Sequence, residues 1–273
     1  MKLYRTTRGP VLEEDGEFFE IHSANWDRLL ASPQLRTQVL ACKGGKIRRP
    51  ADDSWLPPVV AQEVWAAGVT YYRSRDARIA ESKESGGGSF YDKVYNAERP
   101  ELFFKALGSK VIGPFGSVRI RSDAKWSVPE PELALLISSA ETVVGYTIAN
   151  DVSSRDIEGE NPLYLPQAKV YDGSCALGPC ILISDDPLPS DTSIGLTVQR
   201  RGIKIFSDNT NLSNLKRSPK ELTHFLCREN TFPHGVFLLT GTGIVPNDEF
   251  TLMPGDRITI DIEGIGSLTN LVT

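Results

Sequence analysis

Short apolar segments separated by turn residues constrain the fold of this 273-residue chain more than any other feature. They recur along the whole sequence, and helical patterns do not alternate with them regularly. Such an order favours an α+β fold with a mixed or antiparallel sheet over a doubly wound sheet. In the larger, later part of the chain, the segments expected to form strands are VWAAGVTYY, KVIGPFGSVRI, LALLISS, TVVGYTIAND, CILIS, IGLTVQRRG and DRITIDIEGIG.

The first 58 residues form a smaller unit in this interpretation. KLYRTT, GPVLEE and EFFEI are expected strands, and a helical pattern interrupted near Pro33 follows them. Pro57 and Pro58 mark the boundary. We therefore predict a small N-terminal domain over residues 1–58 and a larger domain over residues 59–273. In the larger domain, the segments with a helical or irregular pattern are RSRDARIAESKES, YDKVYNAERPELFFKAL and KRSPKELTHFLCRE.

Composition narrows the classes of partner. The net charge is −5, and the one basic cluster, from Lys43 to Arg49, lacks interleaved aromatic residues, so we expect no nucleic-acid partner. No stretch approaches the length of an apolar membrane span, and the first residues lack the apolar run of a signal peptide. The four cysteines have neither zinc-finger nor Cys-x-x-Cys spacing. Free thiols without such signals are typical of a cytoplasmic protein that has no membrane partner.

A proline-flanked pair of glutamates is the sharpest local signal. Pro129 and Pro131 each fix their own φ and push the preceding residue towards an extended conformation. Side chains two residues apart in an extended chain lie on the same side, so Glu130 and Glu132 should point together. Two carboxylates so close repel each other unless a cation lies between them. Asp151, at the end of another apolar segment, offers a third carboxylate.

Three carboxylates without a nearby histidine or cysteine form a hard ligand set, which prefers Mg2+, Mn2+ or Ca2+ to zinc. Proline–glutamate repeats also occur on protein surfaces, where two solvated glutamates at the end of a strand need no metal. The pattern by itself leaves both interpretations open.

Three motifs extend this signal. VPEPELAL, GYTIANDVSSRD and AKVYDGSCALGPCI occur in this order and together resemble the fumarylacetoacetate hydrolase superfamily over residues of about 60 to 273. The resemblance implies a mixed β-roll, and Mg2+ (or Mn2+ or Ca2+) held by Glu130, Glu132 and Asp151. Members of the superfamily are usually dimers or tetramers, so it also implies a homodimer or a homotetramer.

The same motifs assign further residues. The family lysine falls on Lys169, the threonine that contacts substrate falls on Thr242, and the arginine of the Asn-Asp-Val-Ser-x-Arg-Asp motif falls on Arg155, a second candidate for substrate binding. One position departs from the hydrolases, which usually carry a histidine where this chain has Ser74. A general base must lie near the attacking water, so this departure counts against hydrolysis.

A branch of the superfamily that dehydrates 2-keto-3-deoxy sugar acids is similar in GVTYYRSRDAR and YNAERPELFFKA. That similarity implies Mg2+-dependent dehydration of a 2-keto-3-deoxy pentonate of the D-arabinonate or D-xylonate type to 2,5-dioxopentanoate, through a metal-stabilised enolate, in oxidative pentose degradation. The alternatives are a hydrolase of acylpyruvate-type 1,3-diketones, a decarboxylase or tautomerase of 2-oxo acids, and a binding protein without activity.

Dehydration needs a base and an acid near the substrate. We expect Lys169 to be the base, because a neighbouring cation lowers the pKa of an amine. Glu101 is expected to be the acid or proton shuttle, because it follows a proline and precedes two aromatic residues. Arg75 is a candidate for substrate binding, and Arg73 and Glu98 are weaker candidates.

Overall fold

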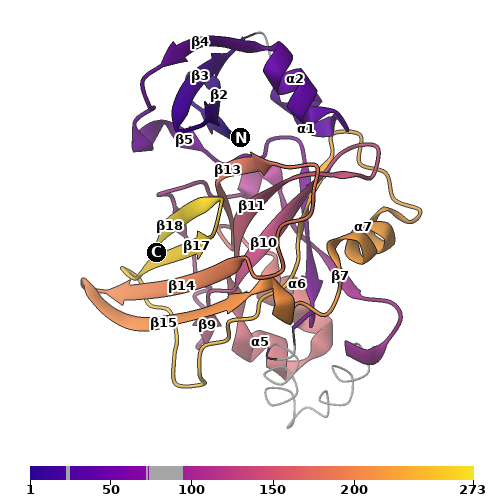
Figure 1. Ribbon diagram of the computed structural model, residues 1–273. Helices are drawn as coiled ribbons and strands as arrows, with labels where there is room; N and C mark the ends of the chain where they lie inside the picture. The colour runs from indigo at the N-terminus through magenta and orange to yellow at the C-terminus, as the bar shows by residue number, and fades with distance from the viewer. Residues whose placement is uncertain (23–24, 72, 74–94) are drawn as a thin grey trace.

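The computed structural model describes residues 1–22, 25–71, 73 and 95–273, and it is dominated by strands (Figure 1). The strands in chain order are β1 Lys2–Thr6, β2 Gly9–Glu14, β3 Glu17–Ile21, β4 Lys43–Ile47, β5 Trp55–Leu56, β6 Glu63–Gly68, β7 Glu101–Leu107, β8 Ser117–Val118, β9 Ser127–Val128, β10 Pro131–Ile137, β11 Val143–Asp151, β12 Ser153–Ser154, β13 Cys175–Ile183, β14 Ser193–Arg200, β15 Ile203–Asn211, β16 Val236–Leu239, β17 Arg257–Ile262 and β18 Gly266–Val272. The helices are α1 Trp26–Ala31, α2 Leu35–Ala41, α5 Arg155–Glu160, α6 Leu165–Lys169 and α7 Pro219–Cys227, with short 3₁₀ turns η1 Asp52–Ser54, η2 Gly108–Lys110, η3 Pro162–Tyr164 and η4 Leu212–Asn214.

One large mixed sheet organises the described residues. Its strand order is β4-β3-β2-β1-β13-β11-β10-β16-β6-β7, and β5 pairs with β1 beside this path. The pairings are antiparallel except that between β16 and β6, which is parallel. The first strands of the chain lie at the top of Figure 1 with α1 and α2, and β1 connects them to β13. The domain boundary at residue 58 remains a prediction.

A second sheet of five strands, in the order β15-β14-β17-β18-β8, packs against the first. Their shared core takes Leu133 and Ile148 from the large sheet and Leu196 and Ile260 from the smaller one, all at most 1% exposed. A separate core lies between the other side of the large sheet and the helices α1 and α2. The central strands β10 and β11 are therefore buried on both sides, so any charged residue on them needs partners within the protein.

Most of the expected segments have the expected structure, and the α+β class with a mixed sheet is confirmed. Two expectations are wrong. The segment ELFFKAL is a strand, β7, because it pairs along its length with β6. KVIGPFGSVRI contains only the end of η2 and the two-residue β8, since two glycines and a proline interrupt it. The helix expected from residue 73 onward lies outside the described residues, apart from Arg73.

In the part of the chain that the structure describes, no helix has both the length and the apolar character needed to cross a membrane.

Candidate metal centre

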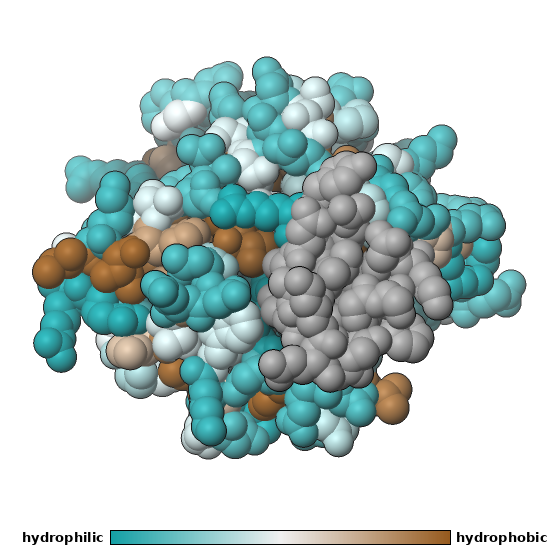
Figure 2. Space-filling model, turned by 90° about the horizontal axis from the view of Figure 1, so that it is seen from below, coloured by the Kyte–Doolittle hydropathy of each residue, from teal (hydrophilic) through white to brown (hydrophobic). Residues whose placement is uncertain are grey.

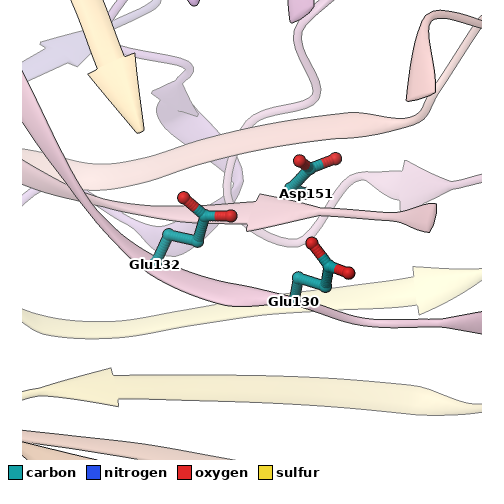
Figure 3. A group of neighbouring side chains, drawn as sticks. All are labelled: Glu130, Glu132 and Asp151. Atoms are coloured by element: carbon teal, nitrogen blue, oxygen red, sulfur yellow. The ribbon is translucent and has the colours of Figure 1, made fainter. Parts of the chain in front are cut away.

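The pairing of β10 with β11 brings the three predicted carboxylates together. Glu132 lies opposite Ala149, and two residues further along the ladder the Asp151 N–H donates to the Glu130 carbonyl at 3.0 Å. Residues two apart point to the same side of a strand, so Glu130, Glu132 and Asp151 share one side of the sheet. Figure 3 shows the three carboxylates turned towards one another. One ligand oxygen from each lies within 4.8 Å of the others.

These carboxylates are buried. Glu130 is 4% exposed, and Glu132 and Asp151 are each 1% exposed, which excludes the alternative of solvated surface glutamates. Burial, followed by the negative charges of Asp151 and Glu130, raises the pKa of Glu132 well above its ordinary value. The carboxylate form of Glu132 is thus disfavoured until a positive charge compensates it.

Lys169, at the end of α6, lies among these carboxylates as predicted. Its Nζ donates to Glu130 Oε2 at 2.6 Å, to Asp151 Oδ2 at 3.2 Å and to Ser153 Oγ at 2.5 Å. The side chain is 1% exposed. The amine is therefore held at a fixed point beside two of the three metal-ligand candidates.

A second buried lysine, which the sequence analysis did not identify, contacts the same aspartate from the other side. Lys105 on β7 is fully buried, and its Nζ lies 2.5 Å from Asp151 Oδ1. It also donates to the carbonyls of Val152, at 3.3 Å, and Lys169, at 2.5 Å. Lys105 thus fixes the orientation of Asp151 and the backbone that carries Lys169. The sequence feature that could have indicated Lys105 is a single lysine within a segment of aromatic and aliphatic residues.

Helix α5 adds an arginine and a fourth acid. Arg155 donates from Nη2 to Glu130 Oε1 at 2.7 Å, and it is 2% exposed. Its partner three residues later, Glu158, is 1% exposed, with its oxygens 4.0 Å from Arg155 Nε and 3.9 Å from Lys169 Nζ. The sequence analysis did not identify Glu158. Glu158 follows the motif arginine Arg155 by three residues, and on a helix this spacing brings the two side chains together.

The Gly-Thr-Gly turn after β16 closes the site. The Gly241 N–H donates to Glu132 Oε2. Thr242 is 4% exposed, and its hydroxyl donates to the Ile244 carbonyl at 3.2 Å. Gly241 has φ +91°, and a Cβ there would clash with Thr70 Oγ1, so only glycine fits. The turn places a backbone donor on a metal-ligand candidate and brings Thr242 next to it.

The other candidates have contacts of their own or lie outside the described residues. Glu101 is half-buried on β7 and packs over Gly68, where a Cβ would meet its carboxylate. Arg73 is exposed and pairs with Asp208 at 2.6 Å. Glu98 is exposed, and its carbonyl accepts a hydrogen bond from Arg217. Arg75, Ser74 and Gly86–Gly88 lie outside the described residues.

None of the chain's three histidines belongs to the cluster. His22, His224 and His234 are all exposed. His22 contacts Glu20, and His224 contacts Arg228. The buried centre therefore offers an amine and carboxylates for proton transfer, and no imidazole.

The residues present suit a hard divalent cation. The donors are three carboxylates, and the pKa of one of them, Glu132, is raised by burial and then by the negative charges of Asp151 and Glu130. In the buried cluster the carboxylates outnumber the cations by one, and a divalent cation would offset this excess. The carboxylates are Glu130, Glu132, Asp151 and Glu158, and the cations are Lys105, Lys169 and Arg155.

Comparison with known proteins agrees with this geometry. The family model described as "Fumarylacetoacetate (FAA) hydrolase C-terminal" matches residues 73–273, which is well over half of the chain. The chain belongs to the fumarylacetoacetate hydrolase family. The predicted mixed fold is also that of solved members of this family.

Two relatives within this family are dehydratases by name. The chain is 49% identical over 217 residues to a "Probable 2-keto-3-deoxyxylonate dehydratase" from Haloferax volcanii, covering 79% of this chain and 74% of the relative. It is 42% identical over 214 residues to a "2-dehydro-3-deoxy-D-arabinonate dehydratase" from Saccharolobus solfataricus, covering 77% and 72%. A solved structure described as "2-keto-3-deoxy-D-arabinonate dehydratase complexed with magnesium and 2,5-dioxopentanoate" superimposes with a TM-score of 0.86 at 32% identity, covering 100% of this chain and 99% of that one.

Proposed function

We propose that the chain catalyses the Mg2+-dependent dehydration of a 2-keto-3-deoxy-D-pentonate to 2,5-dioxopentanoate. One observation carries the proposal: the Lys169 amine lies 2.6 Å from Glu130 and 3.2 Å from Asp151 in a centre that contains no histidine. A buried amine beside a bound carbonyl compound can remove a proton from the adjacent carbon. Water-activating hydrolysis instead needs a base aimed at a water molecule.

The names of the two relatives point to one substrate. Conversion of C2 to a ketone and of C3 to a methylene removes the stereocentres by which D-arabinonate and D-xylonate differ. Only C4 remains, and it has the D configuration in both. The 2-keto-3-deoxy derivatives of the two acids are therefore the same molecule, and the two names describe one substrate.

Glu130, Glu132 and Asp151 are the proposed metal ligands. When bound, Mg2+ supplies a Lewis acid for the carboxylate and keto oxygens of the substrate and makes the C3 protons more acidic. Lys105 and Arg155 hold the ligands Asp151 and Glu130 in place from the protein side. Each of these contacts is made by a side chain no more than 2% exposed, so water does not compete for it.

Lys169 takes the C3 proton in this scheme, and the C4 hydroxyl leaves as water with a proton supplied by Glu101. A proton then moves from C5 to C3, which turns the hydroxymethyl end into the enol of an aldehyde. The enol becomes the aldehyde when it loses its O–H proton and C4 gains a proton. The net change is the loss of one water molecule. We assign Thr242, Arg155 and Arg75 to substrate binding, with Thr242 supported by the turn that reaches Glu132.

The experiment offers purified protein and Mg2+ two substrates, 2-keto-3-deoxy-D-arabinonate and an acylpyruvate. We expect 2,5-dioxopentanoate from the first and no pyruvate from the second. Pyruvate from the acylpyruvate, with no dioxopentanoate from the sugar acid, would overturn the proposal in favour of a hydrolase.

We also propose that the chain forms a homodimer or a homotetramer. Figure 2 shows hydrophobic surface at the protruding end of the β14–β15 hairpin, on the left of the view, and there Ile203 is 70% exposed. An exposed apolar patch at the edge of a sheet supports a subunit contact. Sedimentation equilibrium measures the oligomeric state, and a monomer at micromolar concentration would contradict the proposal.

The four unpaired cysteines support a cytoplasmic location.

A further inference from the structure

A pocket opens beside the Gly-Thr-Gly turn that contacts Glu132. It has a volume of about 610 Å³, and the residues that matter here are Tyr71, Thr210, Asn214, Lys216 and Gly243. We call it the hydroxyl pocket. It is formed where the turn after β16 meets the end of β15 and the 3₁₀ turn η4.

The Gly-Thr-Gly turn borders both the pocket and the metal centre. Gly241, the first residue of the Gly-Thr-Gly turn, donates to Glu132, and Gly243, the third residue, lines the pocket. A Cβ at Gly243 would lie 2.7 Å from the Tyr71 ring and 3.0 Å from Thr210 Oγ1, so these groups meet at that point. Tyr71 is 1% exposed, and the charge of Glu132 contributes to raising the pKa of its phenol, after burial. The pocket therefore lies within two residues of the backbone group that contacts Glu132.

Several residues that line the pocket are neutral and polar, among them Thr210, Ser213 and Asn214. Asn214 Nδ2 donates to Thr210 Oγ1 at 3.2 Å, which leaves the Thr210 O–H group directed elsewhere as a donor. The cations at the rim have other partners. Arg73 pairs with Asp208 at 2.6 Å, and Lys216 donates to the Tyr95 carbonyl and lies 3.7 Å above its ring. This chemistry suits hydroxyl groups better than a second carboxylate.

We propose that the hydroxyl pocket binds the hydroxyl-bearing end of a 2-oxo acid whose carboxylate end lies at the metal centre, with Thr210 and Asn214 as the residues that select a hydroxylated chain. The inference rests on the proposed function, and it adds a specificity site to it. It follows that 2-oxo acids without a terminal hydroxyl bind more weakly than those that carry one.

The test uses two ligands that cannot be dehydrated, because neither has a C4 hydroxyl: 5-hydroxy-2-oxopentanoate and 2-oxopentanoate. Their affinities for the Mg2+-loaded protein are measured by calorimetry. We expect the hydroxylated ligand to bind about threefold to tenfold more tightly, which is the effect of one or two net hydrogen bonds. Thr210→Val combined with Asn214→Ala should remove this preference and leave the affinity for 2-oxopentanoate within about twofold.

Thr197→Val is the matched control, since Thr197 lies on the neighbouring strand β14, bonded to Ser207 and not to the pocket. It should keep the full preference. Equal affinities in the natural protein, a preference that survives in the double variant, or no binding of either ligand would each overturn the inference. Neither ligand reports on dehydration, so a protein that shows the preference but does not convert the pentonate would refute the proposed function alone. Thermal melting of each variant verifies that it is folded.

Discussion

The buried metal centre and the hydroxyl pocket beside it differ in burial and in the charge of their residues. The centre gathers ionisable side chains that are at most 4% exposed, such as Glu130 and Lys105. The pocket is open and relies on Thr210 and the exposed Asn214. The charged side chains of the centre stabilise one another, and removal of one partner leaves an uncompensated buried ion. A neutral pocket has no such dependence, so its residues can change at a small cost.

The contrast teaches where chemistry and selectivity reside. Large effects on turnover and on stability should come from single changes in the centre, because both buried lysines there have two or more partners. Changes in the pocket should alter which substrate is preferred, by small factors.

Glu132→Gln should abolish activity. The change removes a metal-ligand charge while it keeps the shape of the side chain, and we expect turnover to fall by about 10³-fold or more. The variant should also lose the rise in melting temperature that Mg2+ gives to the natural protein. Glu249→Gln, an exposed residue, is the control and should change neither quantity. Full activity in Glu132→Gln would remove this residue from the centre.

Lys169→Met separates proton transfer from metal binding. Turnover should fall by about 10²- to 10⁴-fold, the usual contribution of a general base. Calorimetry should still detect Mg2+ binding, because the three carboxylates remain. If Mg2+ binding disappears together with activity, Lys169 acts as structural support for the ligands and not as the base.

Lys105→Met tests the dependence of buried charges on one another. Asp151 would lose a contact of 2.5 Å, and we expect the free energy of unfolding to fall by about 3–5 kcal/mol. Adding Asp151→Asn should recover most of this loss, since the double variant leaves no uncompensated aspartate. Urea denaturation of both variants measures the difference. A loss below about 1 kcal/mol in the single variant would mean that the ion pair contributes little.

The pH dependence of Mg2+ binding is a smaller effect with a definite sign. The raised pKa of Glu132 means that the metal-free protein holds a proton there to a higher pH than the unfolded chain does. This proton stabilises the metal-free fold at low pH, and the contribution is lost as pH rises through the folded pKa. Mg2+ must displace the proton, so its affinity should fall by up to about tenfold per pH unit below that pKa. Affinity that is constant with pH would contradict the assignment.

The sequence placed the three carboxylates on one side of the sheet, as the structure has them, because much of their geometry is local. Two prolines fix the strand around Glu130 and Glu132, and the motifs locate Asp151 and Lys169. Lys105 was missed because its segment was interpreted as helical or irregular, and only pairing with β6 makes it a strand. Thr210 and Asn214 were missed for another reason: β15 and η4 reach the site through long-range contacts that no local pattern encodes.

The most direct test of the central claim follows 2-keto-3-deoxy-D-arabinonate by proton NMR in D2O with the Mg2+-loaded protein. We expect an aldehyde signal from 2,5-dioxopentanoate and deuterium at C3 of the product, because solvent-exchanged groups of the protein return the proton there. Both signals should be absent when Lys169 is replaced by Met. An unchanged substrate, cleavage products in place of the aldehyde, or undiminished product with the Lys169 variant would contradict the account.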